Sequence, residues 1–150
     1  MAKRNIFRGL AAVLALGMCM TGLAGCGSEK RADGKTEIEV VSYKPEAVKA
    51  FEKIEKRFNE THDDIHLTIS SPNEAMTILK TRFIREDYPD IIAIGGDINY
   101  SNFLDADLFE DISGLDEVQT VKQAYLDMDK ELEFIPKDGT YALPYVANAA

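Results

Sequence analysis

The stretch Tyr88–Asp97, YPDIIAIGGD, decides the fold. Its continuous apolar run, 91–94, is ended by paired glycines, which is typical of a buried strand in a parallel sheet. Two upstream segments also predict strands: Glu37–Tyr43 (EIEVVSY) is rich in β-branched residues, and Asp64–Ser70 (DIHLTIS) alternates apolar and polar residues. Three strands at this spacing leave room for a helix between each pair.

Helical patterns fill both intervals. In 46–60 (EAVKAFEKIEKRFNE) apolar residues recur every three or four positions, and Pro45 suits the first turn. Ser71-Pro72-Asn73-Glu74 matches a capping box in front of a second helix. The apolar stripes of the two helices are Val48, Phe51, Ile54 and Phe58, then Met76, Leu79, Phe83 and Ile84.

The order strand, helix, strand, helix, strand predicts an α/β fold with a mostly parallel, doubly wound sheet flanked by helices. Downstream, 101–115 indicates a short helix and a turn, and 121–134 indicates another helix. Asp138-Gly139 predicts a tight hairpin between two short strands. The sequence shows no internal repeat and no low-complexity tract, which disfavours a structural or adhesive stalk.

The N-terminus has the features of an export signal. Lys3, Arg4 and Arg8 precede the uncharged run 9–24, which is shorter than the roughly 20 residues of a membrane span. The junction Leu23-Ala24-Gly25-Cys26 resembles the bacterial lipobox, in which the cysteine is acylated and becomes the first mature residue. The alternatives are an ordinary signal peptide with an incidental cysteine, or a buried N-terminal helix.

These features divide the chain into a lipoprotein signal peptide at 1–25, a polar flexible tether at 26–36 and a folded domain at 37–150. Cys26 is the predicted lipidation site, so we expect attachment to the outer face of a bacterial membrane. The other cysteine, Cys19, lies in the segment that would be removed, so no disulfide is expected.

The chain is acidic. Its formal net charge is −9 from 17 basic and 26 acidic residues, and loss of 1–25 removes three basic residues and no acidic ones, which gives −12. Such a surface repels nucleic acid and anionic headgroups, so we expect no nucleic-acid partner.

A ligand of an open parallel sheet binds beyond the carboxyl ends of the strands, where the strand order reverses. Those ends are 42–44, 70–71 and Gly95-Gly96-Asp97. The Asp97 carboxylate could accept hydrogen bonds from two vicinal hydroxyls, and Tyr43, Tyr100, Tyr141 or Tyr145 could pack on a sugar ring. Equally, Gly-Gly-Asp could be only a turn, and Tyr141 only a buried strand residue.

Several motifs together resemble the extracellular solute-binding proteins of ABC importers, in particular family 1, the maltose-binding-like sugar binders. They are FEKIEKRFNETHDDIHLTI (51–69), YPDIIAIGGDINYSNFLDADLFEDIS (88–113) and DGTYALPYVANAA (138–150), preceded by the lipobox. The resemblance covers nearly the whole mature chain and implies the first lobe of a type II periplasmic-binding-protein-like fold.

The resemblance also implies a function and a site. The protein would bind a carbohydrate outside the membrane and deliver it to ABC permease subunits as a monomer, without catalysis, cofactor or metal. Asp97 falls on the acid that hydrogen-bonds sugar hydroxyls in this group, and Asn148 on a second polar contact. Tyr145, Tyr43 and Lys44 follow as ligand-binding candidates, the last two matching only loosely. Ile94 stands where a stacking tryptophan is found.

Family members continue past 147–150 (ANAA) into a second lobe, so we expect the present chain to stop before it. Two-lobed binders close around their ligand, and one lobe supplies half of the contacts. We therefore expect weak or absent solute binding if these 150 residues are the entire product.

Two other readings of the function stay open. The cargo could be a polyamine, a peptide or a metal complex, because Asp97 tolerates a cationic ligand. A membrane-anchored surface enzyme is disfavoured by the absence of a G-x-S-x-G motif and of a thiol after export. His62 and His66 have the spacing of a zinc pair on a helix, but they straddle a predicted turn.

Overall fold

A computed structural model describes residues 31–146 of the chain. The predicted signal peptide, Cys26 and Asn148 lie outside the described residues. The part of the predicted tether that the structure describes contains a turn at 31–34. In this turn the Gly34 N–H donates to the Arg31 carbonyl at 2.9 Å. Gly34 has a φ of +83°, which glycine adopts without strain.

Three parallel strands form the sheet. They are β1 (Thr36–Ser42), β2 (Ile65–Ser70) and β3 (Ile91–Ala93), in the order β2-β1-β3. Ile38 pairs with Leu67 in the β1–β2 register, and β3 pairs with the end of β1. The predicted α/β fold with a parallel sheet is confirmed.

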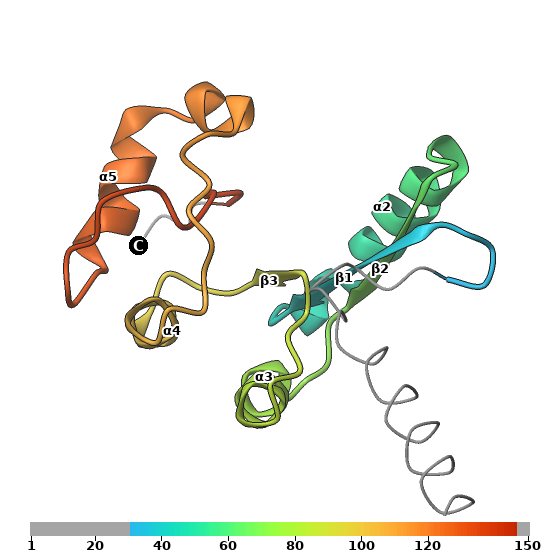
Figure 1. The fold of residues 1–150 in the computed structure, drawn as a ribbon, viewed down its shortest axis with the longest axis horizontal. Coiled ribbons are helices and arrows are strands. Elements are labelled where there is room, and N and C mark those ends of the chain that lie inside the picture. The colour runs from blue at the N-terminus through green and yellow to red at the C-terminus, as the bar shows by residue number, and fades with distance from the viewer. Residues whose placement is uncertain (1–30, 147–150) are drawn as a thin grey trace, which may run out of the picture.

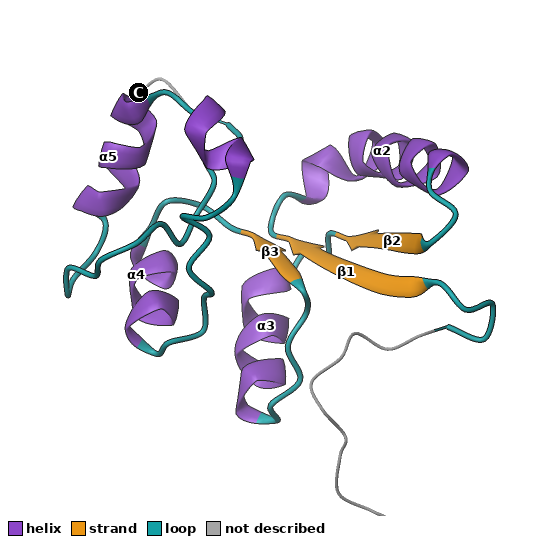
Figure 2. Cartoon of the chain, turned by 45° about the horizontal axis from the view of Figure 1, so that its top comes forward, coloured by secondary structure: helices purple, strands orange, loops and turns teal. Residues whose placement is uncertain are grey.

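The helices between the strands cover opposite faces of the sheet (Figure 2). The chain leaves β1 through a 3-10 turn, η1 (Pro45–Ala47), and continues into α2 (Val48–Thr61), which leads to β2. From β2 it passes through α3 (Ala75–Ile84) on the other face and reaches β3 on the far side of β1. The strand order therefore reverses between β1 and β3, and the crevice of this sheet lies at their carboxyl ends.

The main core lies between the sheet and α3. Val41, Ala75 and Leu79 are buried, and half-buried apolar residues pack around them: Tyr43, Met76, Phe83, Ile92 and Ile94. The predicted stripe of α3 is thus confirmed except at Ile84, which is 86% exposed at the last helical position.

Helix α2 is attached to β2 by polar side chains as well as by its apolar stripe. Asn59 accepts from the Leu67 N–H and donates to the Leu67 carbonyl, both at 2.8 Å, and Glu55 accepts from the Ile69 N–H at 2.8 Å. These backbone groups are on the edge of β2 that faces away from β1, so α2 satisfies an edge that would otherwise be open. No residue of α2 is fully buried, and Ile54 of the predicted stripe is 53% exposed.

An arginine joins α3 to β1 and to the loop before β3. Both terminal nitrogens of Arg82 donate to the Glu39 carboxylate at 2.7 Å, and Asp87 accepts from the same guanidinium at 2.9 and 3.1 Å. The Asp90 carboxylate accepts from the Glu39 N–H at 2.8 Å. This network fixes where β3 begins.

Beyond β3 lie α4 (Ile98–Asp105), a 3-10 helix η2 (Asp116–Thr120) and α5 (Gln123–Glu131), on the side of β3 away from α2 (Figure 1). Both predicted downstream helices are present. Phe103 of α4 meets Phe83 of α3 edge to face at 5.0 Å between ring centroids, which connects the two parts of the core.

The predicted hairpin at Asp138-Gly139 is wrong, because no strand forms on either side of it. Instead, Thr140 pairs with a segment far upstream: its carbonyl accepts from the Ile112 N–H at 2.7 Å and its N–H donates to Asp111 Oδ1 at 3.0 Å. Gly139 has a φ of +106°, so the turn exists but serves this long-range contact.

The predicted capping box at Ser71–Glu74 is also wrong. The helix begins later, at Ala75, and its N-cap Glu74 makes no side-chain cap hydrogen bond. The Ser71 hydroxyl donates to the Ser42 carbonyl at 3.2 Å and so joins the ends of β2 and β1. Within residues 31–146, no helix is long and apolar enough to span a bilayer.

Candidate ligand-binding site

Asp97 stands where β3 has ended and α4 begins. Its Oδ1 caps α4, accepting from the Asn99 N–H at 2.8 Å and from the Asn99 side-chain amide at 2.9 Å. The sequence predicted two acceptor oxygens in the crevice, but the helix cap occupies one of them. Oδ2 makes no hydrogen bond with residues 31–146, and the residue is exposed, so this oxygen is available to a ligand.

Tyr43, directly after β1, brings its hydroxyl to the same place. Its N–H donates to the Ala93 carbonyl at 3.0 Å, which continues the pairing between β1 and β3. A methyl group on Gly95 would lie 3.2 Å from Tyr43 Oη and 3.4 Å from Asp97 Oδ2. The phenol and the free carboxylate oxygen therefore both lie beside Gly95, at the point where the strand order reverses.

Lys44 and Tyr145 surround this pair. Lys44 Nζ lies 5.0 Å from the Tyr43 ring centroid and 3.8 Å from Glu46, and its proximity to the Tyr43 hydroxyl raises the pKa of the ammonium. Burial raises the pKa of the Tyr145 hydroxyl, Tyr43 adds to the rise and the Lys44 charge opposes it. Because Tyr145 is still 53% exposed, its ring can face solvent or a ligand.

A cavity of about 190 Å³ opens beside Tyr43. Its other walls come from the chain after β2 and from the start of α3, namely Asn73, Glu74, Ala75, Met76 and Thr77. The sequence analysis missed Asn73 and Glu74 as site residues because it assigned both to a helix cap. The available signal was their position, since they follow β2 at the same edge of the sheet as Tyr43 and Asp97.

The structure thus brings four of the five predicted ligand-binding residues to one edge of the sheet: Tyr43, Lys44, Asp97 and Tyr145. Asn148 lies outside the described residues. Ile94 packs on the core and presents no aromatic face.

The two histidines do not form a common site. His62 ends α2, where its ring stacks on Phe58 at 3.9 Å between centroids, and His66 lies within β2. Among residues 31–146, no group of three or more His, Cys, Asp or Glu side chains is arranged to hold a metal ion.

The profile of the family described as bacterial extracellular solute-binding protein matches residues 37–150. The chain belongs to this family. The chain is also similar to the multiple sugar-binding protein of Streptococcus mutans serotype c (strain ATCC 700610 / UA159), with 27% identity over 139 residues. That match covers 90% of this chain and 32% of the relative.

The chain is also similar to solved structures of solute-binding proteins. The apo form of RafE from Streptococcus pneumoniae matches with a TM-score of 0.57 and 30% identity, over 62% of this chain and 24% of RafE. RafE in complex with raffinose matches equally well. The chain therefore spans about a third or less of the length of these relatives. The resemblance to this family found in its sequence is confirmed.

Proposed function

We propose that the protein is the extracytoplasmic solute-binding component of an ABC importer, that it binds a carbohydrate and that it delivers this solute to permease subunits. The observation that carries the proposal is that the Tyr43 hydroxyl and Asp97 Oδ2 both lie beside Gly95, where the strand order reverses. A carboxylate oxygen accepts from a sugar hydroxyl, the phenol donates or accepts beside it, and the absent side chain of Gly95 leaves room for this phenol.

The surrounding groups suit the same ligand. The Tyr145 ring offers an apolar face for sugar C–H groups, and the Lys44 ammonium can donate to a hydroxyl or ring oxygen. Asn73 and Glu74 extend the polar surface along the adjoining cavity. The ligands of the relatives support a carbohydrate: the Streptococcus mutans relative is a multiple sugar-binding protein, and RafE binds raffinose.

Titration with raffinose, followed by amide chemical shifts in NMR, tests the proposal, because this method detects millimolar affinities. We expect saturable shifts at 42–44 and 95–99. Asp97→Asn keeps an N-cap of similar strength but loses the anionic acceptor, so affinity should fall about tenfold, the equivalent of roughly 1.4 kcal/mol. Tyr43→Phe should weaken binding similarly.

The matched control is Asp116→Asn, at an exposed position of η2 away from the site. It should leave raffinose affinity unchanged, and RafE provides a positive control for the sugar. Equal raffinose affinity in Asp97→Asn and the unmodified protein would contradict the assigned site. Binding of spermidine, a tripeptide or a metal chelate in place of any sugar would move the proposal to a non-sugar cargo.

Attachment to the membrane is a separate part of the proposal and depends on Cys26. We propose that 1–25 are removed and that Cys26 carries the lipid, which leaves the folded domain at the outer face of the membrane as a monomer. Mass spectrometry of the membrane fraction should find an acylated N-terminal cysteine, and Cys26→Ala should release the protein. If the Cys26→Ala variant stayed in the membrane fraction to the same extent as the unmodified protein, the cysteine would be incidental.

A further inference from the structure

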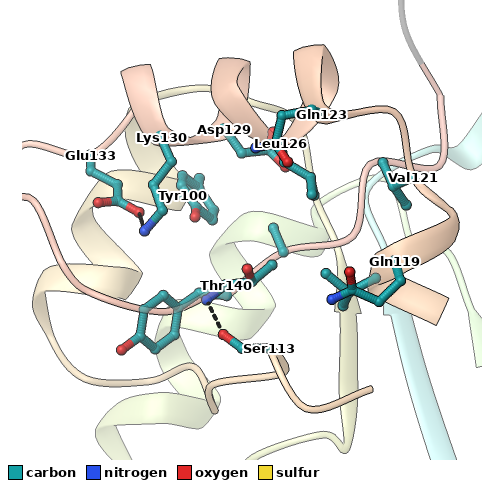
Figure 3. Close-up of a pocket in the computed structure, with 13 residues that line it drawn as sticks. Tyr100, Ser113, Gln119, Val121, Gln123, Leu126, Asp129, Lys130, Glu133 and Thr140 are labelled. Carbon is teal, nitrogen blue, oxygen red and sulfur yellow. Dashed lines mark hydrogen bonds and ion pairs between the residues drawn. The ribbon is translucent and has the colours of Figure 1, made fainter. Parts of the chain in front are cut away.

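A second cavity, of about 440 Å³, lies under α5 (Figure 3). Its walls are α5, Tyr100 of α4, the chain at 113–121 and the chain at 140–142. It shares no lining residue with the cavity beside Tyr43. A volume of this size accommodates a small organic molecule.

One carboxylate oxygen in this cavity lacks a partner. Asp129 Oδ2 is inaccessible to bulk solvent and makes no hydrogen bond with any described residue. The side chain comes from α5 and lies beside Tyr100, which is 5% exposed (Figure 3). A carboxylate without a donor is unfavourable. Because the half-buried Asp129 side chain lines the cavity, the site favours a molecule that brings a donor to this carboxylate.

The neighbouring charges do not compensate Asp129. Lys130 Nζ donates to Glu133 Oε1 at 2.8 Å and to the Lys137 carbonyl at 2.6 Å. The Glu133 side chain is 2% exposed, and its Oε2 accepts from the Lys137 N–H at 2.9 Å. Lys130 and Glu133 are therefore paired with each other. Among the lining residues Asp129 is the acid without a cationic partner, and burial raises the pKa of its carboxyl group.

The groups around Asp129 indicate a ligand that is partly polar and partly apolar. Burial, followed by the charges of Glu133 and Asp129, raises the pKa of Tyr100 to about 12, so its hydroxyl is neutral and can accept a hydrogen bond. Val118, Val121 and Leu126 provide apolar walls. A cationic donor is favoured over a neutral one, since hydrogen bonds between charged partners are roughly twice as strong and the chain is acidic overall.

We propose that this cavity is a second small-molecule site, which binds an organic ammonium ion. The ammonium group donates to the Asp129 carboxylate and to Tyr100 Oη, and the alkyl part lies against Val118 and Leu126. The site is independent of the proposed sugar site because it uses other elements and other residues.

Calorimetric or NMR titration with butylammonium chloride tests this, with 1-butanol as the neutral analogue of the same shape and sodium chloride as the salt control. We expect saturable binding of butylammonium, at least tenfold weaker binding of 1-butanol, and shifts at 113–121 and 123–133. Asp129→Asn should weaken butylammonium binding at least tenfold. The matched control Glu131→Gln, an exposed residue of the same helix, should change it less than twofold.

A second variant keeps the test decisive if Asp129→Asn does not fold. Leu126→Trp fills the cavity with its indole and should abolish butylammonium binding while raffinose titration gives the same result as in the unmodified protein. The proposal is overturned if butylammonium does not saturate, or if it binds equally to Asp129→Asn. It is also overturned if Asp97→Asn abolishes binding and Asp129→Asn does not, because the cation would then occupy the first site. Failure of sugar binding alone affects only the proposed function.

Discussion

Substitution of Gly139 by alanine should be among the more destabilising single changes in the chain. Its φ of +106° is unfavourable for an alanine by about 1–2 kcal/mol. The added methyl would also lie 2.7 Å from Asp111 Cγ and Oδ2, a clash comparable with overpacking, at about 1–3 kcal/mol. Lower chain entropy of the unfolded alanine variant offsets roughly 0.4–1 kcal/mol. We therefore expect a net loss of about 2–3 kcal/mol.

Two other glycines separate these contributions. Gly34 has a φ of +83° with nothing within 4 Å of a new methyl, so Gly34→Ala reports the backbone conformation alone, about 1 kcal/mol. Gly114 has neither a positive φ nor a close neighbour, so Gly114→Ala should be neutral or stabilising by about 0.4–1 kcal/mol.

Urea unfolding at neutral pH, followed by circular dichroism, measures all three variants against the unmodified protein. The expected order of stability is Gly114→Ala, then the unmodified protein, then Gly34→Ala, then Gly139→Ala. If Gly139→Ala is no less stable than Gly34→Ala, the contact with Asp111 does not constrain this turn, and our account of the 111–140 connection is wrong.

Three further predictions concern polar contacts. Arg82→Met removes the bidentate pair with Glu39, in which the side chains are 20% and 33% exposed, and should lower stability by about 1–2 kcal/mol in urea unfolding. Asn59→Ala leaves two backbone groups of Leu67 without partners and should cost about 1–3 kcal/mol in the same assay, with faster amide exchange in β2. The hydroxyl of Ser113, followed by backbone N–H donors, lowers the pKa of Asp111, so its stabilising contribution is present above about pH 4 and is lost as the pH falls further. Asp111→Asn should flatten the acid limb of a stability–pH curve.

Matched controls accompany these predictions. Arg57→Met, on the exposed side of α2, should change stability by less than about 0.5 kcal/mol, and so should Asn102→Ala, on the exposed side of α4. Losses as large as those of Arg82→Met and Asn59→Ala would mean that the general effect of the substitution, not the contact, determines the result. An unchanged acid limb in Asp111→Asn would assign acid unfolding to other carboxylates.

Local pattern was sufficient to predict the strands and helices. β-Branched and alternating segments became β1 and β2, and the apolar run at 91–94 became β3. The predicted burial of this last strand is wrong among residues 31–146, because Ile91 is 52% exposed. Strand direction followed from the interval lengths, because each was long enough for a crossover helix. The position of Tyr43 and Asp97 at one edge of the sheet then followed from the rule that ligands approach the carboxyl ends of parallel strands.

The errors arose where a long-range partner displaced a local one. Ser71 is bound by the Ser42 carbonyl, 29 residues away in the chain, so it does not cap α3. Asp111 and Ile112 hold Thr140, so the Asp138-Gly139 turn does not pair two strands. Asn73 and Glu74 were missed as neighbours of Tyr43 for a different reason. Helix caps and ligand-binding sites use the same residue types, so the sequence pattern alone does not distinguish them.

The side chains that α2 places along β2 have a consequence for how the sheet can grow. With the outer N–H groups of Leu67 and Ile69 already occupied by Asn59 and Glu55, an additional strand would find two donors of that border already bonded. β3 forms the opposite border, and its outer side faces no further strand among residues 31–146. Enlargement of the sheet, whether by more of the same polypeptide or by a foreign peptide, is therefore directional and proceeds from β3 outward.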